Sequence, residues 1–112
     1  MKDKIHFEEF LEIEKKLEIK IGFITLAEVM PKSHNLKLTV EFGSEDKRTV
    51  VTNLGKTHTP EQLIGLTMPF ITNLEPTTIK GVLSEAMIMV GTGAEGQLQV
   101  GLNSFDTGTN LL

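Results

Sequence analysis

The most constraining feature of the sequence is a strict alternation of apolar and polar residues between Leu36 and Phe42. Because successive side chains of a β-strand point to opposite faces, this alternation predicts a strand with one buried face. A polar run with a glycine, residues 43–46, and a stretch rich in β-branched residues, 47–52, come next. Together they predict a second strand that pairs antiparallel with the first through a hairpin connection.

Other segments predict strands and helices around this hairpin. Alternating or apolar runs cover residues 17–29, 67–73, 85–90 and 97–100, and in the first run Ile19, Ile21 and Phe23 are expected on one face. Residues 59–62 read Thr-Pro-Glu-Gln, the spacing of a capped helix start, so a short helix ending at Gly65 is expected. The apolar stripe between Ile5 and Leu17 has helical spacing, which predicts an amphipathic N-terminal helix.

The resulting order of elements has short connections and no regular alternation of strands with long helices. We therefore expect an all-β fold, a five-stranded Greek-key barrel of the OB type, with an N-terminal helix and a short helix between strands three and four. The residues expected in one barrel core are Leu38, Val40, Val50, Ile71 and Ile88. With 112 residues, of which 39% are apolar, the chain suits a single domain spanning residues 1–112.

Charge is distributed unevenly along the chain. The formal net charge of −4 weighs against nucleic acid, because phosphate binding needs clustered Lys and Arg. Residues 32–56 nevertheless carry five basic and three acidic residues, although a solvated pair of strands explains this local excess equally well. The chain has no cysteine, and its first thirty residues lack the apolar stretch of a secretory signal or membrane span. A cytoplasmic location is therefore expected.

Patterns associated with catalysis or cofactors lack the context they need. Residues 91–96 spell G-x-G-x-x-G, but too few residues follow for a dinucleotide-binding unit, so a flexible hairpin loop is expected there. His6, His34 and His58 have no carboxylate or second histidine at a metal-ligand spacing. No nucleophile elbow surrounds Ser84. We expect no catalytic residue, no metal and no cofactor, and thus a protein that is not an enzyme.

Residues 73–87, with the sequence NLEPTTIKGVLSEAM, are dense in hydrogen-bonding side chains. This stretch resembles the N-L-x-P-x-K-x-x-G-x-x-S-x-x-M signature of the tRNA-binding domains found in CsaA, at the C-terminus of methionyl-tRNA synthetase and in the endothelial monocyte-activating polypeptide. Residues 48–52 are similar to the third strand of that family, and residues 36–43 to the second strand of its CsaA branch. The resemblance covers roughly residues 5–92 and implies a free-standing, non-catalytic tRNA-binding domain.

The resemblance also implies a set of contact residues. The expected RNA-binding residues are Lys37 and Arg48 on the second and third strands, and Asn73, Lys80, Ser84 and Met87 on signature positions. Asn and Ser can bond phosphate, sugar or a base edge, Lys neutralises phosphate, and Met offers a soft apolar face to a base. Without the resemblance, Asn73 and Ser84 would be interpreted as turn residues and Met87 as a core residue.

Two departures from the family pattern affect the expected partner. Thr78 stands where the signature has Lys, and Glu75 precedes the proline where some relatives are basic, so tRNA binding is expected to be weak. The expected partner is tRNA, recognised by its shape through the barrel face. The alternative partner is unfolded or precursor polypeptide, because the CsaA branch is associated with chaperone-like help in protein export.

The N-terminal stripe formed by Phe7, Phe10, Leu11 and Leu17 raises the question of assembly. This is more apolar surface than a small barrel easily covers, and an exposed apolar patch favours association. Relatives of this size are similar in pairing through their terminal segments, so a homodimer is expected. The alternative is that the helix closes one end of its own barrel.

Overall fold

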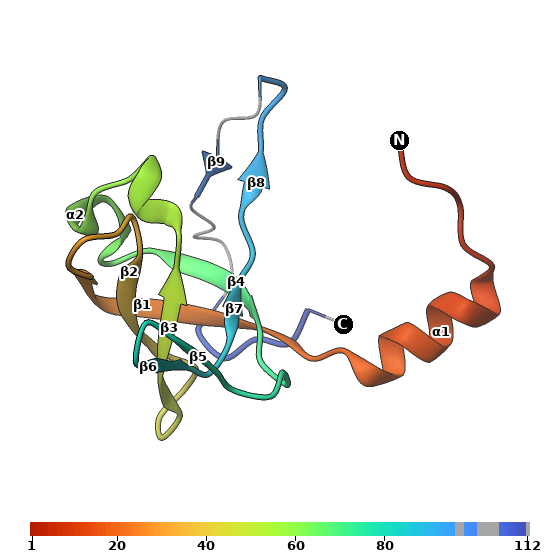
Figure 1. Ribbon diagram of the computed structural model, residues 1–112. Helices are drawn as coiled ribbons and strands as arrows, with labels where there is room; N and C mark the ends of the chain where they lie inside the picture. The colour runs from red at the N-terminus through yellow and green to blue at the C-terminus, as the bar shows by residue number, and fades with distance from the viewer. Residues whose placement is uncertain (96–97, 101–105, 112) are drawn as a thin grey trace.

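A curved antiparallel sheet forms the body of the protein (Figure 1). The computed structural model describes residues 1–95, 98–100 and 106–111. The strands of this sheet, in chain order, are β1 (Ile19–Val29), β2 (Leu36–Glu41), β3 (Lys47–Thr52), β4 (Thr67–Ile71) and β7 (Met87–Ile88). Their spatial order is β3-β2-β1-β4-β7, and every pairing is antiparallel. The predicted five-stranded barrel of the OB type and the β2–β3 hairpin are confirmed.

Helical turns lie between β3 and β4, as predicted. A 3₁₀ turn, η1 (Leu54–Lys56), precedes the short helix α2 (Pro60–Leu63). The Gln62 side chain accepts a hydrogen bond from the Thr59 backbone N–H at 2.8 Å, which satisfies an otherwise free donor at the helix start. No helix within the described residues is long and apolar enough to cross a membrane.

Two short hairpins complete the fold. β5 (Thr77–Ile79) pairs with β6 (Val82–Ser84), a hairpin that was not among the predicted strands. Lys80 and Gly81, both with positive φ, form its two-residue turn. β8 (Gly91–Thr92) pairs with β9 (Leu98–Gln99), so the glycine-rich run belongs to a hairpin as expected, although residues 96 and 97 lie outside the described part of the chain.

The barrel core differs from the predicted core at one position. Leu38, Val40 and Val50 are fully buried, and Ile88 is partly buried against them, as expected. The prediction for Ile71 is wrong, because the alternation along β4 turns Met68 and Phe70 inward and leaves Ile71 on the outer face.

The core side of β1 carries a glycine. Gly22 faces the core, where a Cβ atom would lie 2.5 Å from Val40 and 2.6 Å from Phe42. Ile19 and Ile21 are buried, but they lie outside the main core cluster. The backbone of Ile19 bonds residue 111, and the backbone of Ile21 bonds residues 108 and 109. Phe23 is only partly buried. A side chain at position 22 would push apart the residues on which the core depends, so glycine is required there.

The barrel closes between β3 and the β6–β7 connection, largely through side chains. The backbone N–H of Glu85 donates to the Thr49 carbonyl at 2.8 Å, and the Glu85 carboxylate accepts from the Thr49 N–H at 3.0 Å. One step further along, the Ser84 hydroxyl accepts from the Val51 N–H at 2.9 Å and donates to the Ala86 carbonyl at 3.3 Å. These bonds satisfy donors and acceptors on an edge of β3 that the β2–β3 ladder leaves free.

Arg48 lies at one end of the barrel, on the face of the sheet that also carries core residues. It stands opposite the buried Val40, and its guanidinium lies 5.2 Å from the centre of the Phe42 ring. It donates to both carboxylate oxygens of Asp46, at 2.9 and 3.0 Å, and to the Thr72 carbonyl at 2.6 Å. Through these contacts the Arg48 cation links the turn between β2 and β3 to the residue that follows β4.

The steric role of Gly22 predicts the effect of adding one methyl group. Gly22→Ala should lower the free energy of unfolding by about 1–3 kcal/mol, the usual cost of overpacking a core. The matched control is Gly91→Ala, in another strand, where the nearest atom to a new Cβ is 3.5 Å away and stability should be nearly unchanged. Urea unfolding monitored by circular dichroism measures both, and equal stability of the two variants would contradict the packing argument.

The Arg48–Asp46 pair predicts a dependence of stability on acid. The hydrogen bonds from Arg48 hold the pKa of the Asp46 carboxyl below its ordinary value. A lowered folded pKa means that the pair stabilises the protein above the unfolded value of about 3.9 and that this contribution is lost as pH falls through the lower folded pKa. The melting temperature of Asp46→Asn should therefore lie below that of the wild type at neutral pH.

The difference between the two proteins should shrink below about pH 4, where Asp46 becomes protonated in the wild type. Glu45→Gln, the neighbouring carboxylate in the same turn, is the control and should match the wild type at neutral pH. Thermal melts between pH 2 and pH 7 provide the comparison. A difference between Asp46→Asn and the wild type that stays constant over this range would show that Asp46 does not act through its charge.

Candidate nucleic-acid interface

Three of the six predicted RNA-binding residues have their polar atoms engaged within the fold. Arg48 and Ser84 take part in closing the barrel, as described above. The Asn73 side chain accepts from the Glu18 N–H at 2.9 Å and donates to the Lys16 carbonyl at 2.5 Å. It thereby fixes the junction between β1 and the N-terminal helix α1 (Phe7–Lys16). Ser84 is buried and Arg48 is only partly exposed, whereas the exposed amide of Asn73 keeps one N–H and one oxygen lone pair beyond these bonds.

The other three predicted residues remain accessible. Lys37 stands opposite Val51, and opposed residues of two paired strands share a face, so Lys37 lies on the outside of the barrel. Lys80 is exposed at the tip of the β5–β6 hairpin, and Met87 is 54% exposed. Across the described ranges, neither lysine forms a salt bridge. Both ammonium groups are therefore available to an anion.

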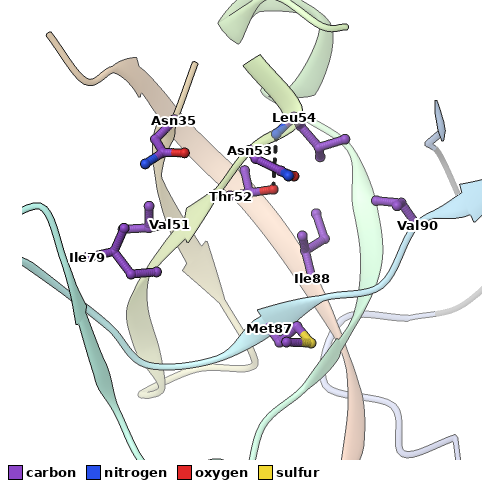
Figure 2. A pocket seen from close by; sticks show the side chains of 9 residues that line it. All are labelled: Asn35, Val51, Thr52, Asn53, Leu54, Ile79, Met87, Ile88 and Val90. Atoms are coloured by element: carbon purple, nitrogen blue, oxygen red, sulfur yellow. Dashed lines mark hydrogen bonds between the residues drawn. The ribbon is translucent and has the colours of Figure 1, made fainter. Parts of the chain in front are cut away.

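A hollow of about 370 Å³ opens next to these residues, between the end of β3 and the strands β5 and β7 (Figure 2). A second hollow of about 220 Å³ lies on the signature side and shares Val51, Ile79 and Met87 with the first. A third, of about 190 Å³, includes His34 and His58 and shares Asn35 with the first. The second and third hollows each adjoin the first, and we call the three together the β3 groove.

The lining of the central hollow combines apolar walls with two amides. Its apolar surface comes from Val51, Ile79, Met87, Ile88 and Val90, together with Leu54. Figure 2 shows Asn35 and Asn53 near the end of the hollow away from Met87. Neither asparagine was among the predicted contact residues, and the only signal in the sequence is that each is a polar residue next to an end of a predicted strand. Apolar walls with a few polar groups are typical of sites for small organic groups.

Solved structures with the same fold include two that match nearly the whole chain. A MetRS-related protein from Pyrococcus horikoshii has 25% sequence identity and a TM-score of 0.83, covering 99% of this chain and 100% of that one. The chaperone CsaA from Bacillus anthracis has 27% identity and a TM-score of 0.77, covering 98% of this chain and 100% of that one. The barrel and its N-terminal helix thus recur in independently solved proteins.

Sequence relatives include methionine–tRNA ligases. The ligase of Methanococcoides burtonii is 44% identical over 94 residues, which are 83% of this chain, and that of Flavobacterium johnsoniae is 39% identical over 97 residues, or 87%. The chain spans only 13% of the length of either ligase. The family described as putative tRNA binding domain matches residues 19–110, nearly the entire barrel. The chain therefore belongs to the putative tRNA binding domain family.

Proposed function

We propose that this protein is a non-catalytic module that binds tRNA through the β3 groove and acts in the cytoplasm, where tRNA is used. The observation that carries the proposal is the membership of residues 19–110 in a tRNA-binding family. Lys37 and Lys80, which form no salt bridge with any described residue, stand beside the groove and supply the phosphate contacts that such binding needs. The negative net charge is compatible with this proposal because RNA responds to the local charge of the surface it meets.

Roles within the predicted set differ in this proposal. Lys37 and Lys80 neutralise phosphates, and Met87 contacts a base or sugar with its exposed thioether. Arg48, Asn73 and Ser84 act as positioning residues, because their polar atoms hold the barrel and the start of β1 in place. With Thr78 and Glu75 at positions that are basic in the signature or in some relatives, few cations remain, so affinity should be modest and strongly dependent on salt.

Reversing the two groove charges tests this function. Lys37→Glu combined with Lys80→Glu should weaken binding of total tRNA at least about tenfold and flatten its salt dependence, since each lost phosphate contact reduces the salt slope by about one. Both side chains are outside the core, so the melting temperature should hardly change. Mobility-shift titrations over a salt series measure affinity and slope together.

The matched control changes the net charge equally at a distance from the groove. Lys2→Glu combined with Lys4→Glu lies before α1 and should leave tRNA affinity close to that of the wild type. An equal loss in both double variants would indicate binding to overall charge without a defined surface. Full affinity in the groove variant would exclude the β3 groove as the tRNA surface.

A second candidate function is binding of unfolded or precursor polypeptide. It is favoured by the structural similarity to the chaperone CsaA of Bacillus anthracis and by the apolar walls of the groove. The salt series separates the two functions, because burial of apolar peptide side chains does not release counterions and so lacks the steep salt dependence of phosphate binding.

We also propose that two copies associate through α1. Figure 1 shows α1 extending away from the barrel, and none of its residues is buried, so the helix does not close an end of its own barrel. Phe7 is 72% exposed, and Phe10 and Ile13 are exposed on the same helix. A two-fold pair would cover these side chains and present two grooves to one RNA, which raises avidity without a new contact.

Light scattering tests the homodimer. At about 10 μM, a pair of roughly 1 μM affinity remains largely associated, so the mass should be close to twice the 12.4 kDa of one chain. Phe7→Ser combined with Phe10→Ser should give the single-chain mass while the circular dichroism spectrum keeps its β-sheet signal. A wild-type mass near 12.4 kDa would refute the dimer.

A further inference from the structure

Two asparagine side-chain amides at the β3 groove, those of Asn35 and Asn53, face the central hollow. Asn35 precedes β2, and its backbone is fixed on both sides, with its N–H donating to Ser33 Oγ and its carbonyl accepting from the Met30 N–H. Asn53 follows β3 at the cap position of η1, but its side chain makes no capping bond. Within the part of the chain that the structure describes, no other protein group bonds either amide. Each amide can therefore donate and accept towards a ligand.

The hollow beneath these amides has the size and lining for a flat, partly apolar ring. Its volume of about 370 Å³ falls at the small end of the range of ordinary ligand sites, about 300–1,000 Å³. Val51 and Ile79 form one part of its wall, and Ile88 and Val90 form another (Figure 2). Met87 adds a polarizable thioether, which packs well against aromatic faces. An aromatic ring with a hydrogen-bonding edge satisfies both the walls and the amides.

We propose that this hollow binds one unpaired nucleobase of the RNA, with its ring between the apolar walls and its edge hydrogen-bonded to Asn35 and Asn53. The proposal rests on the proposed tRNA-binding function and gives the groove a preference for single-stranded or extruded nucleotides. A base held in a duplex presents neither its faces nor its pairing edge, so it cannot enter.

The surroundings of the hollow favour a nucleotide over a peptide side chain. Lys37 shares an outer face with Val51, so a phosphate attached to the bound base can reach its ammonium group. The adjoining third hollow contains His34 and His58, and the Thr57 hydroxyl lies 2.8 Å from His58 Nδ1. A neighbouring nucleotide can therefore meet hydrogen-bonding groups in the third hollow and the cation of Lys37. An apolar peptide side chain would leave both amides without partners.

The test measures binding of an unstructured RNA hexanucleotide containing 2-aminopurine, whose fluorescence reports the surroundings of the base. The wild type should bind it, change its fluorescence, and bind a blunt RNA duplex at least about tenfold more weakly. Asn35→Ala combined with Asn53→Ala should lose about tenfold in affinity, the value of one base-edge contact, with an unchanged salt slope because phosphate contacts remain. Ser44→Ala, at the opposite end of the β2–β3 hairpin, is the control.

Each outcome decides the proposal. The base-binding proposal would be overturned by wild-type affinity in the asparagine double variant, or by equal binding of duplex and single strand. If total tRNA still bound with a steep salt dependence in that case, the proposed tRNA-binding function would stand without the base-binding hollow. The proposal would also be overturned if the wild type did not bind the hexanucleotide but bound a reduced, unfolded polypeptide, and the asparagine variant lost that binding. The hollow would then be a polypeptide-binding site. Circular dichroism melts of the variant verify that folding is unchanged.

Discussion

The side-chain closure of the barrel at β3 is the interaction on which the rest of the structure depends. A fully paired β3–β7 ladder would seal the barrel, but here the Ser84 hydroxyl and the Glu85 carboxylate take the place of backbone acceptors at only two positions, Val51 and Thr49. Beyond Val51, the hollow of about 370 Å³ opens between the end of β3 and the strands β5 and β7. The closure at Thr49 and Val51 therefore sets where the barrel wall ends and the groove begins.

The strands were predictable because burial on one face imposes a period of two. The period of two predicted the buried face correctly on β2, where every second residue is buried. On β4 the predicted buried face was displaced by one residue. Ile71 and Phe70 are both apolar, and hydrophobicity alone does not decide which one faces inward. The β5–β6 hairpin was missed because Thr77 and Thr78 are exposed, which removes the alternation, although Lys80-Gly81 between two β-branched residues was an available turn signal.

The candidate site was less predictable than the fold because the role of a polar side chain depends on contacts far away in sequence. Asn73 bonds Lys16, which lies 57 residues before it, and Arg48 bonds Thr72 across 24 residues. No local pattern distinguishes such a residue from one that awaits a ligand. The free amides of Asn35 and Asn53 were overlooked for the same reason, since their importance comes from the apolar walls that β5 and β7 bring beside them.

This arrangement changes how a loss of RNA binding at a signature residue should be interpreted. Removing the Ser84 hydroxyl would leave the buried Val51 N–H without a partner and would let the wall formed by Ile79 and Met87 move. A fall in RNA affinity in such a variant would follow from that movement alone and would not require a contact between Ser84 and RNA. Lys80 differs, because its side chain lies on an exposed turn outside the contacts that close the barrel. A residue is therefore identified as an RNA contact only where its substitution changes RNA affinity and leaves the free energy of unfolding unchanged. Lys37, Lys80, Asn35 and Asn53 can be tested in this way, whereas substitution of a residue that closes the barrel changes both quantities.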